Sequence, residues 1–102
     1  MINITQEQLN LITSILQKHI PDRLIKAFGS RITGKSKEFS DLDLAIYGDN
    51  SIDLIILGSL KEAFSQSDLP FLIDIVDINQ ISDDFRKLIE KKNITIQDHA
   101  SP

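Results

Sequence analysis

Two carboxylates and a Gly-Ser pair in the first half of the chain could do chemistry together. Asp41 and Asp43 lie two residues apart in DLDLAIY (41–47), which begins with the alternation of a strand, so both side chains project from one face. Neighbouring carboxylates repel each other, and a divalent cation such as Mg²⁺ favours their joint ionisation. Ten residues separate this pair from Gly29 and Ser30. Glycine lets a backbone approach a phosphate, and the serine hydroxyl can bond its oxygens.

Each of these features also has an ordinary explanation. An Asp-Leu-Asp-Leu segment alone is commonly the wet face of a half-buried strand, and a Gly-Ser pair alone is a turn. Their conjunction at this spacing, between apolar strands, favours a site that holds a metal ion and a nucleoside triphosphate.

The segment GSRITGKS (29–36) also matches the P-loop pattern G-x-x-x-x-G-K-[ST]. A P-loop needs a helix that begins at its Lys-Ser pair, so that the helix N-terminus cradles the phosphates. Only residues 37–40 separate Ser36 from the strand that opens at Asp41. Four residues cannot form that helix, so we reject the P-loop interpretation.

Periodicity and capping signals predict the elements that position these residues. We expect three main strands, the first stopped by Gly29 and the third the most apolar, and helices capped by Thr5, Ser51 and Ser82. A loop with room for one helical turn follows the first strand, and the middle helix contains Gly58. The expected elements are a helix over 5–19, a strand over 24–28, a strand over 41–47, a helix over 52–66, a strand over 70–77, a helix from 83 to about 92 and a short strand over 94–96. The order predicts one α+β domain over 1–102, with a small mixed sheet of three to four strands, about four helices, and a loose tail over 97–102.

Composition narrows the classes of function. The chain has 102 residues, a net charge of −4 and no cysteine. Duplex nucleic acid is an unsuitable ligand, since binding depends on phosphate neutralisation by basic residues. Disulfides, thiol catalysis and Cys-ligated zinc are excluded, and the apolar runs are too short to span a membrane. The N-terminus has no signal-peptide pattern, so we expect a cytoplasmic protein.

The run GSRITGKSKEFSDLDLAI (29–46) resembles the signature G-S-x₁₀-D-x-D of the DNA polymerase β-like nucleotidyltransferase superfamily. Its Gly-Ser-Arg start and Ser-Asp-x-Asp-Leu end look most like the minimal nucleotidyltransferase (MNT) branch. Members of that branch are commonly encoded beside a HEPN-domain protein and serve as its antitoxin. The signature covers 29–46, and the order of elements extends the resemblance over most of the chain.

The family pattern adds a third carboxylate on the following strand, for which Asp74 and Asp77 compete. Asp74 is expected in mid-strand between apolar residues, where an ionised carboxylate is costly unless it is paired or metal-bound. Asp77 has the opposite strand parity and is expected at the exposed end, where it could simply cap a turn. On that burial argument we predict Asp74, whose ordinary alternative is a buried acid bonded to an arginine or an amide.

The resemblance implies roles for these residues. Asp41, Asp43 and Asp74 would hold two Mg²⁺ ions that bridge the triphosphate of ATP, and Asp74 would help deprotonate the acceptor hydroxyl. Gly29 and Ser30 would position the β- and γ-phosphates. Arg31 is left open between pairing with a phosphate and packing against an acidic neighbour. The remaining polar residues are expected in ordinary roles: Lys35 and Lys37 as solvated loop lysines, Tyr47 as a packing residue, and His19 and His99 as bystanders.

The implied function is Mg²⁺-dependent transfer of AMP from ATP to a protein hydroxyl, such as a tyrosine of a HEPN-family toxin, which would make the chain an antitoxin. The sequence shows no added helical domain after the third carboxylate strand, so the acceptor site must come from a partner or a second copy. The alternative is a binding module that neutralises the toxin by occlusion, with weak or absent transfer. Transfer to a small molecule is a third, less favoured reading.

Overall fold

The computed structural model describes residues 4–34 and 40–98. Helices and strands alternate along the chain, as expected for an α+β protein. The elements in order are α1 (Gln6–His19), β1 (Leu24–Phe28), α2 (Ser30–Thr33), β2 (Leu42–Tyr47), α3 (Leu54–Ser65), β3 (Ile73–Asp77), the 3₁₀ helix η1 (Ile78–Gln80), α4 (Asp83–Lys91) and β4 (Ile94–Gln97). The predicted α+β architecture, with a small mixed sheet and about four helices, is confirmed.

The four strands form one mixed sheet in the order β3-β2-β1-β4. β1 is antiparallel to both of its neighbours, whereas β2 and β3 run parallel. Because side chains alternate along a strand, β2 buries Leu42, Leu44 and Ile46 on one face and turns Asp43 to the other. Because β2 and β3 are parallel, they begin at the same end of the sheet, and the predicted carboxylates Asp43 and Asp74 lie at this end.

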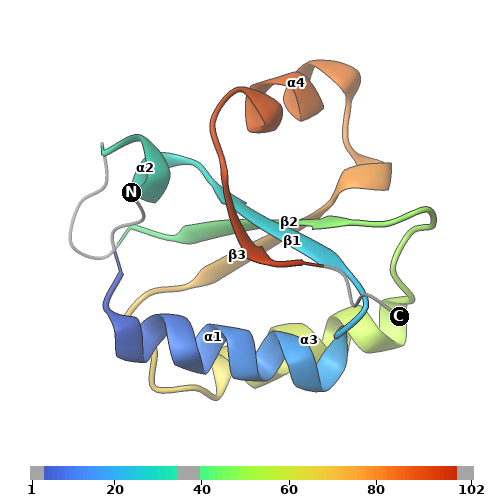
Figure 1. Ribbon diagram of the computed structural model, residues 1–102. Helices are drawn as coiled ribbons and strands as arrows, with labels where there is room; N and C mark the ends of the chain where they lie inside the picture. Colours follow the sequence, from blue (N-terminus) through green and yellow to red (C-terminus); the bar gives the residue numbers. More distant parts are fainter. Residues whose placement is uncertain (1–3, 35–39, 99–102) are drawn as a thin grey trace.

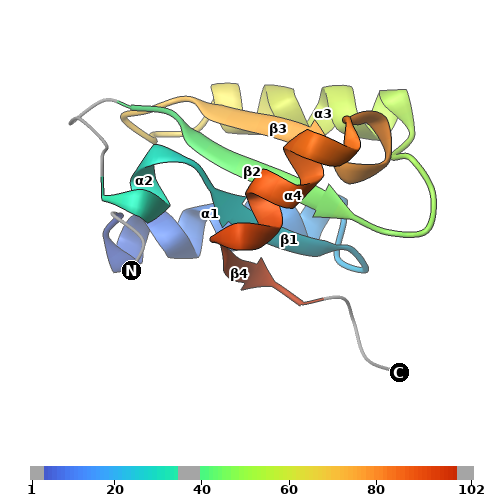
Figure 2. The ribbon, with the colours of Figure 1, turned by 90° about the horizontal axis from the view of Figure 1, so that it is seen from above.

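Helices cover both faces of the sheet. Figures 1 and 2 show α1 and α3 side by side on one face, with α4 lying across the other. The larger core lies under α1 and α3, where Leu16, Leu44 and Leu60 are fully buried. A smaller core lies under α4 and contains Phe28, Ala45 and Ile89. The three-layer arrangement leaves the end of the sheet at the start of β2 free for a site.

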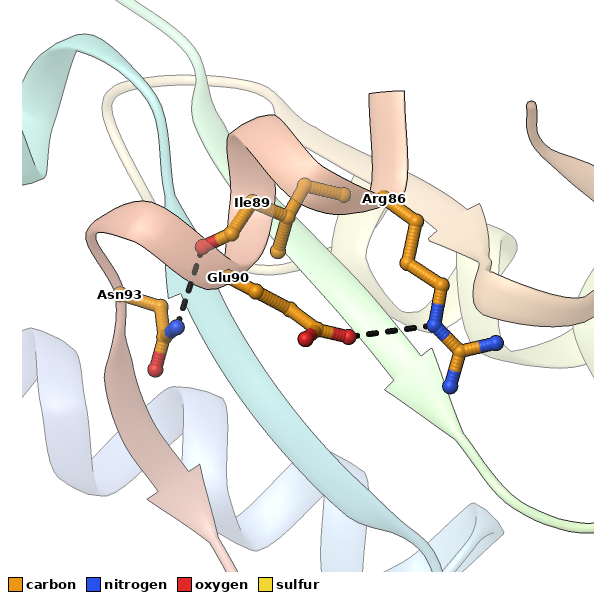
Figure 3. Close-up of polar contacts among 4 residues, drawn as sticks. All are labelled: Arg86, Ile89, Glu90 and Asn93. Atoms are coloured by element: carbon orange, nitrogen blue, oxygen red, sulfur yellow. Dashed lines mark hydrogen bonds and ion pairs between the residues drawn. The ribbon is translucent and has the colours of Figure 1, made fainter. Parts of the chain in front are cut away.

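The two outermost helices begin where the sequence predicts. Thr5 and Gln8 form the reciprocal capping box of α1, and Ser82 accepts a hydrogen bond from the Phe85 amide at the start of α4. An Arg86–Glu90 ion pair stabilises α4 along its exposed side, and the Asn93 side chain donates to the Ile89 carbonyl at its end (Figure 3). These local signals set where α4 begins and stabilise its exposed side, whereas the buried Ile89 packs it on the sheet.

The predicted cap of α3 is wrong. Ser51 does not begin the helix, because Asp53 accepts hydrogen bonds from the amides of Ile55 and Ile56 and α3 starts at Leu54. Ile52 is instead buried, with its amide donating to the Asp77 carboxylate. Gly58 lies inside the helix without interrupting it.

The C-terminal boundaries also differ from the prediction. β3 begins at Ile73 rather than at position 70, and Gln97 belongs to β4 rather than to a loose tail. The Gln97 side chain is buried and donates to the carbonyls of Ile20 and Arg23, which ties β4 to the end of α1. No helix within the described residues is long and apolar enough to cross a membrane.

Candidate active site

The sheet register brings two of the predicted carboxylates together. Asp43 of β2 lies directly opposite Asp74 of β3 in the parallel ladder, so both side chains emerge on the same face. Asp43 is half-buried, whereas Asp74 and Asp41 are exposed. Asp41 precedes β2 by one residue and lies two residues from Asp43. The site therefore consists of a carboxylate pair with a third carboxylate beside it.

Burial and neighbouring negative charge act on the most buried of these carboxylates, Asp43. The pKa of Asp43 is raised from 3.8 to about 6. Burial is the largest cause, followed by the negative charges of Asp74 and Asp41 and by a hydrogen bond between the Asp43 and Asp74 carboxyl groups. A cation placed beside Asp43 would relieve the repulsion that raises its pKa.

Gly29 is the residue that makes room for Asp43. Phe28 pairs with Asp43 across β1 and β2, so the next residue along the chain passes close to the Asp43 carboxyl. Gly29 has φ 86° and ψ −159°, a conformation that is essentially restricted to glycine. A Cβ at this position would also overlap Asp43 Oδ2. The predicted Gly29 and Asp43 are therefore in direct packing contact.

Ser30 follows as the first residue of the short helix α2, with Gly29 as its cap. The helix begins right after Gly29 and ends at Gly34, before the Lys-Ser pair that a P-loop would place at a helix start. Lys35 and Lys37 lie outside the described residues, as does His99. The described part of the segment 29–36, residues 29–34, therefore forms a Gly-Ser turn that leads into a short helix.

Arg31, which the sequence left open between pairing with a phosphate and packing against an acidic neighbour, is buried against an aromatic ring. The side chain is only 4% exposed, and its guanidinium lies 4.1 Å from the centroid of the Phe71 ring. Its Nε donates to the Ser40 carbonyl at 2.7 Å. Arg31 therefore connects α2 to the segments that lead into β2 and β3, the two strands that carry the carboxylates. Phe71 was missed from the sequence, where only its aromatic character before β3 could have drawn attention to it.

The burial argument that favoured Asp74 over Asp77 is reversed in the structure. Asp77 is 7% exposed and accepts hydrogen bonds from the amides of Ile52 and Asn79. Asp74 is exposed, because α4 packs on Val76 of the same strand and leaves the start of β3 open. Because side chains alternate along β3, Asp74 lies beside Asp43, whereas Asp77 faces the opposite side of the sheet. Asp74 is therefore the residue brought to the site, but through strand register and not through burial.

The donor set of the site suits a hard cation. Within residues 4–34 and 40–98, no three His, Cys, Asp or Glu side chains are clustered closely enough to hold a metal ion by themselves. Mg²⁺ does not require such a cluster, since it usually takes one or two carboxylates together with substrate phosphates and water. Asp43 and Asp74, both oxygen donors in mutual repulsion, fit that requirement.

The other residues weighed from the sequence lie away from the carboxylates. Tyr47 is at the far end of β2, with Lys26 over its ring and a buried hydroxyl that has no hydrogen-bond partner among the described residues. Burial and the nearby Glu90 raise the Tyr47 pKa, which agrees with a packing role. The His19 ring nitrogen contacts the Ile15 carbonyl of its own helix.

The site combines a Gly-Ser turn after β1 with carboxylates at the start of two parallel strands, as the resemblance to nucleotidyltransferases predicted. The chain belongs to the polymerase beta nucleotidyltransferase family, which matches residues 10–101.

Known proteins similar to this chain agree with that assignment. Over 97 residues it is 45% identical to a probable protein adenylyltransferase, MntA of Haemophilus influenzae, covering 95% of this chain and 85% of that protein. A crystal structure of a toxin–antitoxin with AMP-PNP is similar with a TM-score of 0.74 and 26% identity, over 88% of this chain and 73% of that one. The fold also matches a complex of tri-AMPylated Shewanella oneidensis HEPN toxin with MNT antitoxin, with a TM-score of 0.69, 24% identity, and coverage of 93% and 73%.

Proposed function

We propose that this chain is a protein adenylyltransferase that transfers AMP from ATP to a hydroxyl of a HEPN-family toxin and thereby acts as its antitoxin. The observation that carries the proposal is the Asp43–Asp74 pair, with Asp43 packed against Gly29, in a chain 45% identical to a probable protein adenylyltransferase. The similarity to a toxin–antitoxin structure that contains AMP-PNP supports ATP as the nucleotide.

Asp43 and Asp74, assisted by Asp41, would hold Mg²⁺ against the triphosphate. The bound metal would neutralise phosphate charge and stabilise the attacking and leaving oxygens. The elevated Asp43 pKa supports this assignment, since a cation would relieve the repulsion that raises it. Gly29 would let the triphosphate approach the backbone, and the Ser30 hydroxyl at the start of α2 would bond the β- and γ-phosphates.

Asp74 is suited to the acceptor side of the reaction. It is the exposed member of the pair, so an incoming protein hydroxyl can reach it while Asp43 stays half-buried beneath. The hydroxyl oxygen would attack the α-phosphorus, the bond to the bridging oxygen would break, and pyrophosphate would leave. Asp74 would accept the hydroxyl proton. Arg31 would position these groups by holding α2 against Ser40 and Phe71, without touching the nucleotide.

The partner is the HEPN-domain protein expected to be encoded beside this chain, here called the cognate toxin. ATP and such a toxin meet in the cytoplasm, which is where we place the reaction. The rival function is occlusion, in which the chain silences the toxin by binding alone.

Intact-mass analysis of the cognate toxin separates the two functions. The toxin is incubated with this chain, Mg²⁺ and each nucleoside triphosphate in turn. We expect adenylyl-sized mass increments with ATP that are lost with Asp43→Ala, while the variant still binds the toxin. A stable complex that silences the toxin without any mass increment would establish occlusion instead.

A further inference from the structure

Two strongly exposed leucines lie on the same side of the sheet as the carboxylates. Leu72 is 71% exposed and Leu88 is 64% exposed. The other large apolar residues that are exposed among the described ones belong to the first turn of α3, on the opposite side of the sheet (Figure 2). Single exposed leucines are ordinary, so the position of these two relative to the site decides whether they have a function.

Leu72 lies next to Asp74 at the edge of the sheet. Its carbonyl accepts a hydrogen bond from the Leu42 amide at 2.9 Å, so the pairing of β2 with β3 extends to the residue before β3. Side chains alternate along this segment: Ile73 packs into the core under α1 and α3, and Leu72 and Asp74 both project on the α4 side. No strand of the described residues lies beyond β3. An incoming protein can therefore reach Leu72 and Asp74 together.

Leu88 projects from the flank of α4 that faces the carboxylates. Phe85 and Ile89 pack toward the sheet. Arg86 lines the cavity that it shares with Tyr47 at the far end of β2. Successive residues turn by about 100° around a helix, so Leu88 lies on the opposite flank from Arg86. Figure 2 shows α2 and the start of β2 on that side of α4, which is the end of the sheet that carries the carboxylates.

The geometry of the reaction determines which ligand these leucines meet. In an in-line displacement, the attacking oxygen and the leaving pyrophosphate lie on opposite sides of the α-phosphorus. Gly29 and Ser30 follow β1, on one side of Asp43, whereas Asp74 lies on β3, on its other side. If Gly29 and Ser30 hold the β- and γ-phosphates, as the proposed function requires, the acceptor hydroxyl approaches from the β3 side. Leu72 therefore meets the protein that carries this hydroxyl and not the nucleotide.

We propose that Leu72 and Leu88 bind apolar side chains of the cognate toxin around its acceptor hydroxyl, and so determine which hydroxyl reaches Asp74. Leu72 contacts the toxin segment at the edge of β3, and Leu88 contacts it from α4. The toxin segment is accordingly apolar beside its acceptor hydroxyl. This proposal rests on the proposed function for the identity of the acceptor. Neither leucine touches the reacting atoms, so both act on specificity and not on the chemical step.

The double variant Leu72→Gln/Leu88→Gln tests the proposal. Glutamine is neutral, similar in size to leucine and well tolerated in a helix, so the change removes apolar contact without adding charge near the carboxylates. Intact-mass kinetics should show a KM for the cognate toxin raised by roughly tenfold or more. The KM for ATP and the rise in Tm caused by AMP-PNP with Mg²⁺ should keep their wild-type values, because the triphosphate lies on the β1 side.

Leu54→Gln is the matched control, since Leu54 is 76% exposed but lies on α3, on the other side of the sheet. We expect it to leave the KM for the toxin unchanged. A wild-type KM for the toxin in the double variant would overturn the proposal, as would an equal rise with Leu54→Gln. A raised KM for ATP or a smaller Tm rise with AMP-PNP would also overturn it, because the leucines would then contact the nucleotide.

Binding measurements keep this proposal separate from the proposed function. If the wild-type chain transfers no AMP, the proposed function fails, and calorimetric titration with the cognate toxin then tests the two leucines by themselves. A Kd raised by the double variant and not by Leu54→Gln would retain Leu72 and Leu88 as toxin contacts. An unchanged Kd would overturn the proposal together with the function.

Discussion

Gly29 meets two separate requirements, one of the backbone and one of the site. Replacement by alanine would strain a φ of 86° and would push a Cβ into the Asp43 carboxyl. We expect Gly29→Ala to lower stability by about 1–3 kcal/mol and to lower AMP transfer by at least about 100-fold, since the acid is displaced. Thermal unfolding and intact-mass kinetics measure the two effects.

Gly34→Ala is the control for backbone strain alone. Gly34 also has a positive φ, of 82°, but no described atom lies within 4 Å of its built Cβ. It should show a stability loss of about 1–2 kcal/mol and nearly normal transfer. Equal loss of transfer in both variants would mean that strain, not contact with Asp43, makes Gly29 necessary.

Asp43 should make the metal-free chain less stable as pH rises. Its folded pKa of about 6 lies above the ordinary 3.8, so between these values the folded state binds more protons than the unfolded state. Stability is then lost as pH increases through about 6. Asp43→Asn should therefore stabilise the chain at pH 8 by about 1 kcal/mol, a figure reduced because the half-exposed group is screened by water, with little gain at pH 4.

Urea unfolding in the presence of a chelator measures this difference. Asp68→Asn, at an exposed position between α3 and β3, serves as the control and should show no comparable gain at pH 8. A pH-independent gain for Asp43→Asn would contradict the electrostatic explanation.

At the scale of elements, Arg31 joins three segments that must stay together for the site to exist. Arg31→Met removes the hydrogen bond to the Ser40 carbonyl and the cation–π contact of the guanidinium with the Phe71 ring. We expect a loss of about 2–3 kcal/mol in unfolding free energy and a lowered kcat, with the KM for ATP little changed. A raised KM for ATP at normal stability would restore the phosphate-binding role.

Arg23→Met offers a comparison at the other end of the sheet. The Arg23 side chain donates to the Asn50 carbonyl and lines a cavity of about 600 Å³ with Tyr47 and Arg86. Its loss should affect stability alone, since it contacts none of the site residues.

Elements set by local signals were the ones predicted correctly from the sequence. Thr5 and Ser82 cap their helices and β1 ends before Gly29, because each signal acts within one turn or strand. The burial of Asp77 could not be predicted, since it depends on Asp77 reaching the Ile52 amide from a distant strand. The Asp53 cap is a local signal, in which Asp53 accepts from the amides of Ile55 and Ile56, and it was missed because Ser51 offered a competing cap two residues earlier. Of the site, the Asp41/Asp43 spacing and the opposite parity of Asp74 and Asp77 could be read from the sequence, whereas the register of Asp43 with Asp74 and the Arg31–Phe71 contact required the folded sheet.

At the scale of the whole molecule, 102 residues bury a limited core, so bound ligands should contribute visibly to stability. Small domains are stable by only about 5–15 kcal/mol, and a ligand at 100 times its Kd adds about 2.7 kcal/mol. Thermal unfolding is therefore a sensitive measure of nucleotide and metal binding, independent of transfer.

We expect AMP-PNP together with Mg²⁺ to raise the Tm by on the order of 10 °C at saturation. AMP-PNP alone should raise the Tm much less, because its triphosphate and the carboxylates repel each other without the metal, and Mg²⁺ alone should also raise it much less. The shift should increase with nucleotide concentration. Asp43→Asn combined with Asp74→Asn should abolish the shift specific to Mg²⁺, whereas Asp77→Asn should lower the baseline Tm and keep the shift, since Asp77 is bonded to the amides of Ile52 and Asn79. A full shift in the Asp43/Asp74 double variant would place the metal and nucleotide elsewhere, and the Asp77 variant would then test whether the opposite face of β3 is involved.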